Sequence, residues 1–393
     1  MQANPTWWSV SMVIEAKATE DQDPFGNAGE HPNDSITQFA MSARSLSFAH
    51  GLCYGFMIGI YGDSCRIIRF DRSSAVVSKS FDYRKRPDIL QRFFWRFSHP
   101  IAGDTIVGCD PAVRPLAQSD ASWVREQLEI LRWNIAMTDE ELLKGRRVVV
   151  RESDEDNAES RNLILFDLLD LDARLFGRAT MVWLAMEDVR ERREALPSSQ
   201  PRQPRLMVYK EAWRQVTHRP ESDFYQRLAL ISKDVRIGLP SMLFGSDLGQ
   251  SEVLAWRAAG KKFPHEDHAG RNSRRIPASL SKGVLEADTS LPAPPVTSSH
   301  KAPDEYEQQR PTEVSGTPEL ASAASFPLPY PLYQTHHWTL LFGDQHATRE
   351  HSLVRQVVDA IGRPLKRFRS TRELVEAVRD AIQGIFLGLN VFG

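Results

Sequence analysis

The sequence predicts an α+β fold in which a small mixed α/β domain precedes a second domain built on an antiparallel sheet. Three observations support this prediction. Short apolar runs typical of strands alternate with helical spacing in the first 115 residues. Farther along, a glycine-marked hairpin and a strand ending in lysine precede a helical run. A long stretch dense in Pro, Ser, Ala and charge then interrupts the pattern and predicts a disordered insertion.

Composition limits the class of protein. With 393 residues the chain has room for two to three domains, and 41% hydrophobic and 25% charged residues are typical of globular proteins. A net charge of -2 provides no bulk attraction to nucleic acid or membrane, so neither is an expected partner. The three cysteines lack metal-ligand spacing and are interpreted as reduced thiols. With no visible signal peptide or membrane span, we expect a soluble intracellular protein, cytoplasmic or nuclear.

Residues 1–115 are predicted to form the mixed α/β domain. Alternating and branched side chains predict the strands, and inward apolar stripes predict the two helices. The predicted strands are Trp7–Ala16, Tyr54–Tyr61, Cys65–Asp71 and Val76–Phe81, and the predicted helices are Ser35–His50 and Pro87–Ser98. In the second of these helices Ile89, Leu90, Phe93, Phe94 and Phe97 are expected to point inward.

Residues 116–262 are predicted to contain a helical connector followed by the hairpin, strand and helix of the second domain. One or two helices are expected within Asp120–Leu143, and an acidic loop separates strands at Arg146–Arg151 and Asn162–Phe166. Leu175–Trp183 is predicted to be strand, tight turn and strand. Arg205–Lys210 is predicted to be a strand, and Glu221 begins a helical run.

Residues 263–331 are the predicted disordered insertion, because their few large apolar side chains cannot offset the entropy of ordering. Residues 332–393 follow as a strand and a final helix. Leu353–Leu365 is predicted to be strand and turn, and Ser370 with Glu373 resembles a capping box that begins the helix.

The order of Gly177, Lys210 and Glu221 carries the chemical signal. In the ATP-gripping lobe of protein kinases, a glycine-containing hairpin covers the phosphates, a strand lysine neutralises them, and a helix glutamate holds the lysine extended. Each residue alone also fits a structural role: an ordinary turn, a surface lysine at a strand end, or an acid in the first turn of a helix. Together, in this order, the three residues are a stronger signal than each alone, but the residues by themselves support the kinase interpretation and three separate structural roles about equally.

Several stretches resemble the fungal-type protein kinase family. Ser80–Tyr83, Phe93–Ser98 and Gly108–Pro111 are similar to its N-terminal signature, and Gly362–Leu365 with Glu373-Leu374-Val375 is similar to its hinge and following helix. Phe176–Trp183 resembles its phosphate loop, and Tyr209–Arg214 resembles its strand-lysine motif. The resemblance implies a kinase-like N-lobe, ATP and Mg as cofactors, and Ser/Thr phosphotransfer. The implied ATP-binding residues are Gly177, Arg178, Thr180, Val182, Lys210 and Glu221.

The sequence departs from the family where the catalytic loop is expected. No His-Arg-Asp and no Asp-Phe-Gly occur, and His218-Arg219-Pro220 lacks the aspartate and precedes Glu221. No residue is therefore assigned as catalytic, and the chain as given is expected to be inactive, to bind ATP weakly if at all, and to end before the catalytic loop. The alternative is a non-catalytic, pseudokinase-like interaction module. Exposed apolar surface under the lobe would then favour an unidentified protein partner.

A second constellation lies near the N-terminus. Glu15 and Lys17 alternate on one strand face, and Gln38 lies on the following helix, an arrangement that resembles a restriction-endonuclease-like core. Ser9 stands where the upstream aspartate is expected, and a single carboxylate holds Mg²⁺ poorly. A surface salt-bridging pair, or the shared fold without nuclease activity, remains the alternative.

Overall fold

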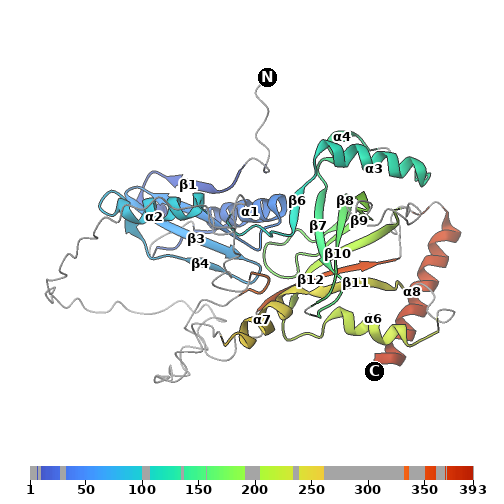
Figure 1. Ribbon diagram of the computed structural model, residues 1–393. Helices are drawn as coiled ribbons and strands as arrows, with labels where there is room; N and C mark the ends of the chain where they lie inside the picture. The colour runs from blue at the N-terminus through green and yellow to red at the C-terminus, as the bar shows by residue number, and fades with distance from the viewer. Residues whose placement is uncertain are drawn as a thin grey trace. The chain divides into compact units, whose positions relative to one another are not determined.

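Figure 1 shows the computed structural model of the chain. It covers residues 7, 10–26, 32–99, 107–133, 137–155, 157–190, 204–232, 239–260, 332–335, 350–359, 368 and 370–392, with the backbone alone at 32–35 and 385–392. These residues belong to one compact unit formed by residues 1–261 and 327–393. The predicted insertion at 263–331 and the hinge-like residues 362–365 lie outside the described residues. The predicted α+β class is confirmed by two sheets with helices.

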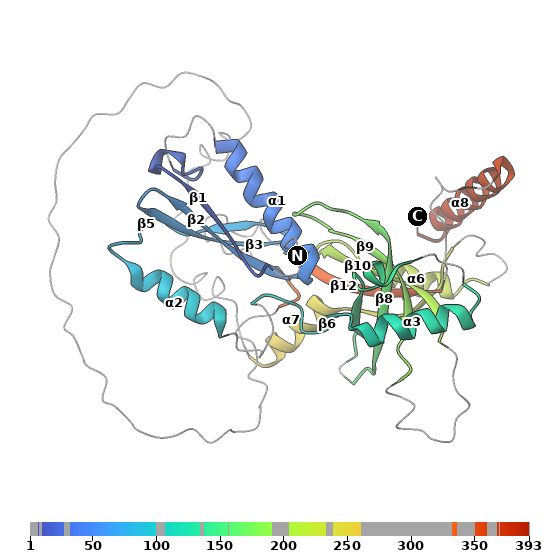
Figure 2. The same ribbon diagram turned by 90° about the horizontal axis from the view of Figure 1, so that it is seen from above.

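The first sheet belongs to the N-terminal region and has the strand order β1-β2-β3-β4, with β5 also paired to β3. Its strands are β1 (Val13–Lys17), β2 (Tyr54–Tyr61), β3 (Ser64–Asp71), β4 (Ala75–Val77) and β5 (Phe81–Asp82). Strands β1 and β2 are parallel, so they need a crossover, which includes the short 3-10 helix η2 (Glu20–Gln22) and the long helix α1 (Pro32–His50). Figure 2 shows α1 alongside these two strands.

The core of this sheet is formed mainly by α1 and the strand faces beneath it. Phe39 and Ala43 of α1 pack with Met57, Tyr61 and Ile68 of β2 and β3. Helix α1 begins three residues before the predicted Ser35. Its buried face is the predicted one, although Ile36 at its start is exposed.

Three details of the N-terminal prediction are wrong. The first strand begins at Val13 instead of Trp7, and the predicted strand Val76–Phe81 is divided between β4 and β5. Helix α2 (Pro87–Ser98) has no buried residue, so its apolar side does not face a core. Phe93 contacts Phe56 of β2 edge-on, with 5.4 Å between ring centroids, whereas Phe94 is exposed. The apolar stripe of α2 exceeds the surface that the sheet offers to it.

The second sheet has seven antiparallel strands in the order β11-β12-β10-β9-β8-β7-β6. They are β6 (Val113–Pro115), β7 (Arg146–Arg151), β8 (Ser160–Leu171), β9 (Met181–Glu187), β10 (Leu206–Gln215), β11 (Met242–Asp247) and β12 (His351–Val358). The sheet curls, since Gly245 of the end strand β11 donates its N–H to the carbonyl of Glu152 just after β7. Apolar side chains from β7 to β12 fill the inside of the curl.

Helices cover the outer face of this sheet in part. Helices α3 (Gln118–Ile130) and α4 (Asp139–Leu142) bury Val124, Leu128 and Leu142 against Ile164 and Leu184 of β8 and β9. Helix α4 lies within the predicted helical region Asp120–Leu143, and α3 begins two residues before that region. The remaining helices are α6 (Glu221–Ala229), α7 (Leu248–Ala258) and α8 (Thr371–Phe392).

The predicted hairpin differs from the structure in its first strand. Strand β8 extends from Ser160 to Leu171, and Leu175–Gly177 belongs to the loop before β9 instead of to a strand. The reason is tertiary, because Leu175 is 7% exposed and packs in the core of the first sheet. A side chain that leaves its own sheet for another core cannot continue the strand.

Candidate functional site

Lys210 lies in the middle of the second sheet, within β10. The prediction that this strand ends at Lys210 is wrong, because β10 continues to Gln215 in register with β12. The neighbours of Lys210 in register are Val182 on β9 and Gln356 on β12. Tyr209 and Glu211 point into the curl, so Lys210 points to the opposite face, because successive strand side chains alternate. Helix α6 begins at Glu221, six residues after β10 ends at Gln215.

Glu221 forms the predicted ion pair with Lys210. The Nζ of Lys210 donates to both carboxylate oxygens of Glu221, at 2.6 and 2.7 Å. Both side chains are half-buried, so the pair holds the lysine extended without removing it from solvent. The expectation that these two residues face each other within salt-bridge distance is confirmed.

Glu221 has two further neighbours. The guanidinium of Arg178 lies 3.8 Å from its carboxylate, which brings the loop before β9 to the same place. One turn along α6, Tyr225 hydrogen-bonds Glu221; burial first, and then the charge of Glu221, raise the pKa of Tyr225 to about 12. Two cations and a phenol therefore surround one carboxylate, and the lysine and arginine place positive charge on the same face of the sheet.

The other residues predicted to bind ATP line the same loop and strand. Val182 is the register partner of Lys210 and shares its face of the sheet. The carbonyl of Thr180 accepts the N–H of Asp172 at 2.8 Å, which closes the base of the loop. The carbonyl of Arg178 accepts the N–H of Trp213 on β10 at 2.7 Å. The structure therefore brings Arg178, Val182, Lys210 and Glu221 together, with Thr180 at the base of the loop.

Gly177 lies at the far end of the loop and is fastened to the N-terminal sheet. Its φ of +107° is a conformation that favours glycine, and no atom lies within 4 Å of the position of an added Cβ. Its N–H donates to the carbonyl of Arg72 at 2.9 Å, and the carbonyl of Leu175 accepts from the Arg72 guanidinium at 3.4 Å. The loop tip is thus held by the segment that follows β3.

A buried ionic network lies on the inner face, behind Lys210. Arg355 of β12 is 1% exposed and pairs with Asp110 and with Glu211, the latter at 3.0 Å. The hydroxyls of Tyr209 and Tyr333 donate to Glu211 and Asp110, at 2.6 and 2.9 Å. Sequence reasoning did not assign this network, although the Gly108–Pro111 motif and Glu211 beside the lysine were the available signals. The network fixes β10 against β12 next to Lys210.

The N-terminal constellation is assembled but has few metal ligands. Lys17 Nζ lies 2.8 Å from Glu15 and donates to Gln38 at 3.4 Å, so β1 and α1 bring the three residues together. Within the described part of the chain, no group of three or more His, Cys, Asp or Glu side chains is placed to hold a metal ion. The geometry corresponds to the salt-bridging pair that the sequence left as an alternative.

The comparison with protein families identifies the fold. The model of the fungal protein kinase family matches residues 1–387. This chain belongs to the fungal protein kinase family. The match includes the N-terminal region, and no comparison supports a restriction-endonuclease-like domain there. No curated protein and no solved structure matches the kinase chain. Among its described helices, none is long and apolar enough to cross a membrane.

Proposed function

We propose that the second sheet of this fungal protein kinase is the lobe that binds ATP, in a protein of the Ser/Thr phosphotransferase class. The observation that carries the proposal is the two-oxygen ion pair between Lys210 and Glu221, formed across a strand and a helix in the kinase order. Lys210 and Arg178 supply positive charge for the phosphates. Val182 and Val208, which share the Lys210 face, supply apolar surface for the base.

The residues at this site are better suited to bind the phosphates of ATP than to bind Mg²⁺. Mg²⁺ in kinases neutralises the charge between phosphate oxygens and is held by carboxylate and amide oxygens. Glu221 is engaged by Lys210, and no cluster of metal-ligating side chains occurs among the residues that the structure describes. We therefore assign the nucleotide phosphates to Lys210 and Arg178 and derive no step through the metal.

Catalysis by these residues alone is not part of the proposal. The 393 residues contain no His-Arg-Asp and no Asp-Phe-Gly, so they supply neither the expected base nor the metal-binding aspartate. We propose that they bind nucleotide weakly and transfer no phosphate by themselves. Radiolabel transfer from ATP to a Ser/Thr acceptor protein, abolished by Lys210→Met, would contradict this part.

The nucleotide site is tested by binding of a fluorescent ATP analogue. Because hydrogen bonds to charged groups contribute about 1.5–3 kcal/mol, Lys210→Met is expected to weaken binding roughly 10- to 150-fold. Glu221→Gln is expected to weaken it less, since the lysine keeps its charge but loses its orientation. Lys144→Met, at an exposed lysine beyond α4, is the matched control and should leave the Kd unchanged. An equal loss of nucleotide affinity in Lys144→Met and in Lys210→Met would contradict the assignment of the phosphates to Lys210.

A second candidate function, a non-catalytic interaction module, is favoured by one observation. Leu175 is buried in the N-terminal core and Gly177 is bonded to Arg72, so the loop tip is engaged where a kinase loop must close over phosphates. In this case nucleotide would not raise the Tm of the wild-type protein at any concentration. A nucleotide-dependent rise in Tm that Lys210→Met removes would exclude this alternative.

A further inference from the structure

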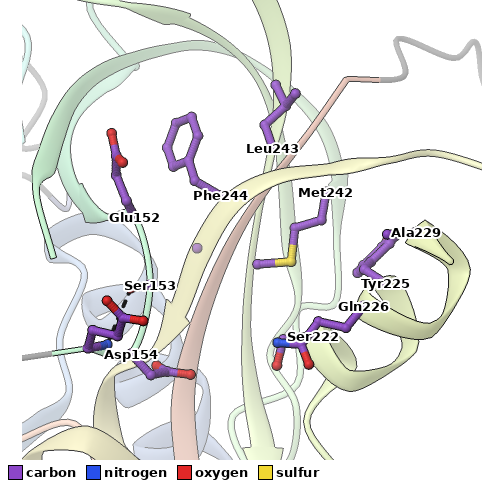
Figure 3. Close-up of a pocket in the computed structure, with 12 residues that line it drawn as sticks. Glu152, Ser153, Asp154, Ser222, Tyr225, Gln226, Ala229, Met242, Leu243 and Phe244 are labelled. Atoms are coloured by element: carbon purple, nitrogen blue, oxygen red, sulfur yellow. Dashed lines mark hydrogen bonds between the residues drawn. The ribbon is translucent and has the colours of Figure 1, made fainter.

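A pocket separate from the Lys210 face lies between α6, β11 and the loop after β7. Its volume is about 540 Å³, and Figure 3 shows the three segments that surround it. From α6, Ser222, Tyr225, Gln226 and Ala229 line it at the spacing of a single helix face. The other lining residues are Glu152–Glu155 and Met242–Gly245.

The pocket combines an apolar floor with an acidic wall. Met242, Leu243 and Phe244 of β11 form the apolar part, and Phe244 is also covered by the Arg161 guanidinium, 4.8 Å from its ring. The wall holds Glu152, Asp154 and Glu155. None of the described residues that line the pocket is a lysine, arginine or histidine.

The three acids differ in how far their charge is already balanced. Glu152 pairs with Arg161. Asp154 accepts hydrogen bonds from the N–H of Asp247 and the hydroxyl of Ser251, at 2.7 and 3.3 Å, which orient it without neutralising it. The exposed Glu155 side chain has no ion-pair partner among the residues that the structure describes. Two carboxylates beside an apolar floor are complementary to an apolar side chain flanked by cations.

We propose that this pocket is a docking site for a segment of a partner protein in which an apolar side chain is flanked by lysine or arginine. The apolar side chain packs on Met242 and Phe244, and the flanking cations lie near Asp154 and Glu155. Nucleic acid and acidic ligands are disfavoured by the same carboxylates. The kind of partner is therefore defined by charge complementarity and by the apolar floor together.

One residue, Tyr225, connects the pocket to the Lys210 site. Tyr225 lines the pocket and hydrogen-bonds Glu221, the partner of Lys210. A bound segment that repositions Tyr225 therefore changes the restraint on Glu221 and on the lysine. This step, unlike the docking itself, rests on the proposed nucleotide function.

The docking is tested with a fluorescein-labelled peptide, Arg-Arg-Leu-Phe-Arg-Arg, by anisotropy on the full chain without nucleotide. We expect saturable binding that weakens with salt, and at least about 10-fold weaker binding of Glu-Glu-Leu-Phe-Glu-Glu and of Arg-Arg-Ser-Ser-Arg-Arg. Glu155→Lys and Ala229→Arg, both at exposed positions, should each weaken binding of the first peptide about 10-fold or more. Glu140→Lys on α4 makes the same charge change away from the pocket and should bind as wild type does.

Two results would overturn the docking proposal. One is equal binding of the acidic and basic peptides, and the other is unchanged binding by both pocket variants with native circular dichroism. Binding of the fluorescent ATP analogue with and without saturating peptide then tests the link to Glu221. Peptide binding with an unchanged nucleotide Kd contradicts only the link through Tyr225, whereas absent nucleotide binding contradicts the proposed function and leaves the docking result standing.

Discussion

Arg355 is the most consequential buried residue outside the candidate site. It is 1% exposed and satisfies both Asp110 and Glu211, each of which is also nearly fully buried. Burial alone would lower the pKa of Arg355, but the charges of Asp110, Tyr209 and Glu211 raise it well above its usual value. The guanidinium therefore stays charged, and its partners depend on it for neutralisation.

Arg355→Met is expected to destabilise the protein by about 3–5 kcal/mol, because two buried carboxylates lose their counter-charge. Urea unfolding followed by tryptophan fluorescence measures the change. Arg84→Met is the control, since Arg84 pairs with Asp63 at the surface and exposed pairs contribute at most about 1 kcal/mol. If Arg355→Met lowers the free energy of unfolding no more than Arg84→Met does, the buried network is not needed for stability.

Glu211 gives the network a pH dependence. Burial by itself would raise the pKa of Glu211, but Arg355 and the hydrogen bond from Tyr209 hold it below its usual value. A carboxylate with a lowered folded pKa contributes stability above its unfolded pKa of about 4.3 and loses it as the pH falls through the folded value. The urea concentration at the unfolding midpoint should thus decrease as the pH is lowered below about 4.3. This decrease should be less steep in Glu211→Gln. Parallel pH profiles for the two proteins would contradict this role.

At the scale of elements, the loop between β8 and β9 is the unusual feature. It belongs to the second sheet by sequence, yet Leu175 packs with Phe39 and Met57 of the N-terminal region. Gly177 and Arg72 add hydrogen bonds beside it. The loop is consequently restrained at its tip as well as at its base, whereas loops that close over ligands are drawn from less stable segments.

Leu175→Ala should release the tip of this loop. Removing a buried leucine side chain costs about 2–5 kcal/mol, and here the loss falls on one loop as well as on the core. Hydrogen exchange at the amides of residues 173–179 should become at least about 10-fold faster, while that of β10 changes less. Leu168→Ala, at an exposed leucine on β8, is the matched control. Unchanged exchange in the loop would show that Leu175 does not restrain it.

At the scale of the whole molecule, the two sheets share interactions that neither makes alone. Arg146 of β7 donates to the carbonyl of Phe48 on α1, and the Cys53 N–H donates to the carbonyl of Gly108 at 2.8 Å. Asp110, which follows that glycine, pairs with Arg355 in the second sheet. Interactions of this kind couple the unfolding of the elements that they join.

We therefore expect the N-terminal region and the second sheet to unfold together. Scanning calorimetry should give one main transition whose calorimetric and van't Hoff enthalpies agree. Asp110→Asn, which weakens the link to Arg355, should lower the Tm of that transition or divide it. Two separate transitions in the wild-type protein would mean that the shared contacts are too weak to couple the two sheets.

Local sequence patterns were sufficient for much of the fold and for the principal pair of the candidate site. The strand that contains Lys210 was predicted apart from its end, and the start of α6 at Glu221 and the helix from Thr371 were predicted, because each depends on the spacing of neighbouring side chains. Strand β11 and helix α7 were missed. Gly245, which interrupts β11, weakens its strand pattern, although Asp247 caps α7 by accepting the Gln250 N–H and was a usable signal.

The sequence by itself determined the α+β class, the order of hairpin, lysine and glutamate, and the family to which the chain belongs. The tertiary structure alone decided that Leu175 leaves its strand for another core and that Asp110 meets Arg355 across 245 positions of the chain. It also decided that β11 curls onto the loop after β7 to form the pocket. Periodicity reports which face of an element is apolar, whereas the partner of that face depends on long-range packing that no local pattern records.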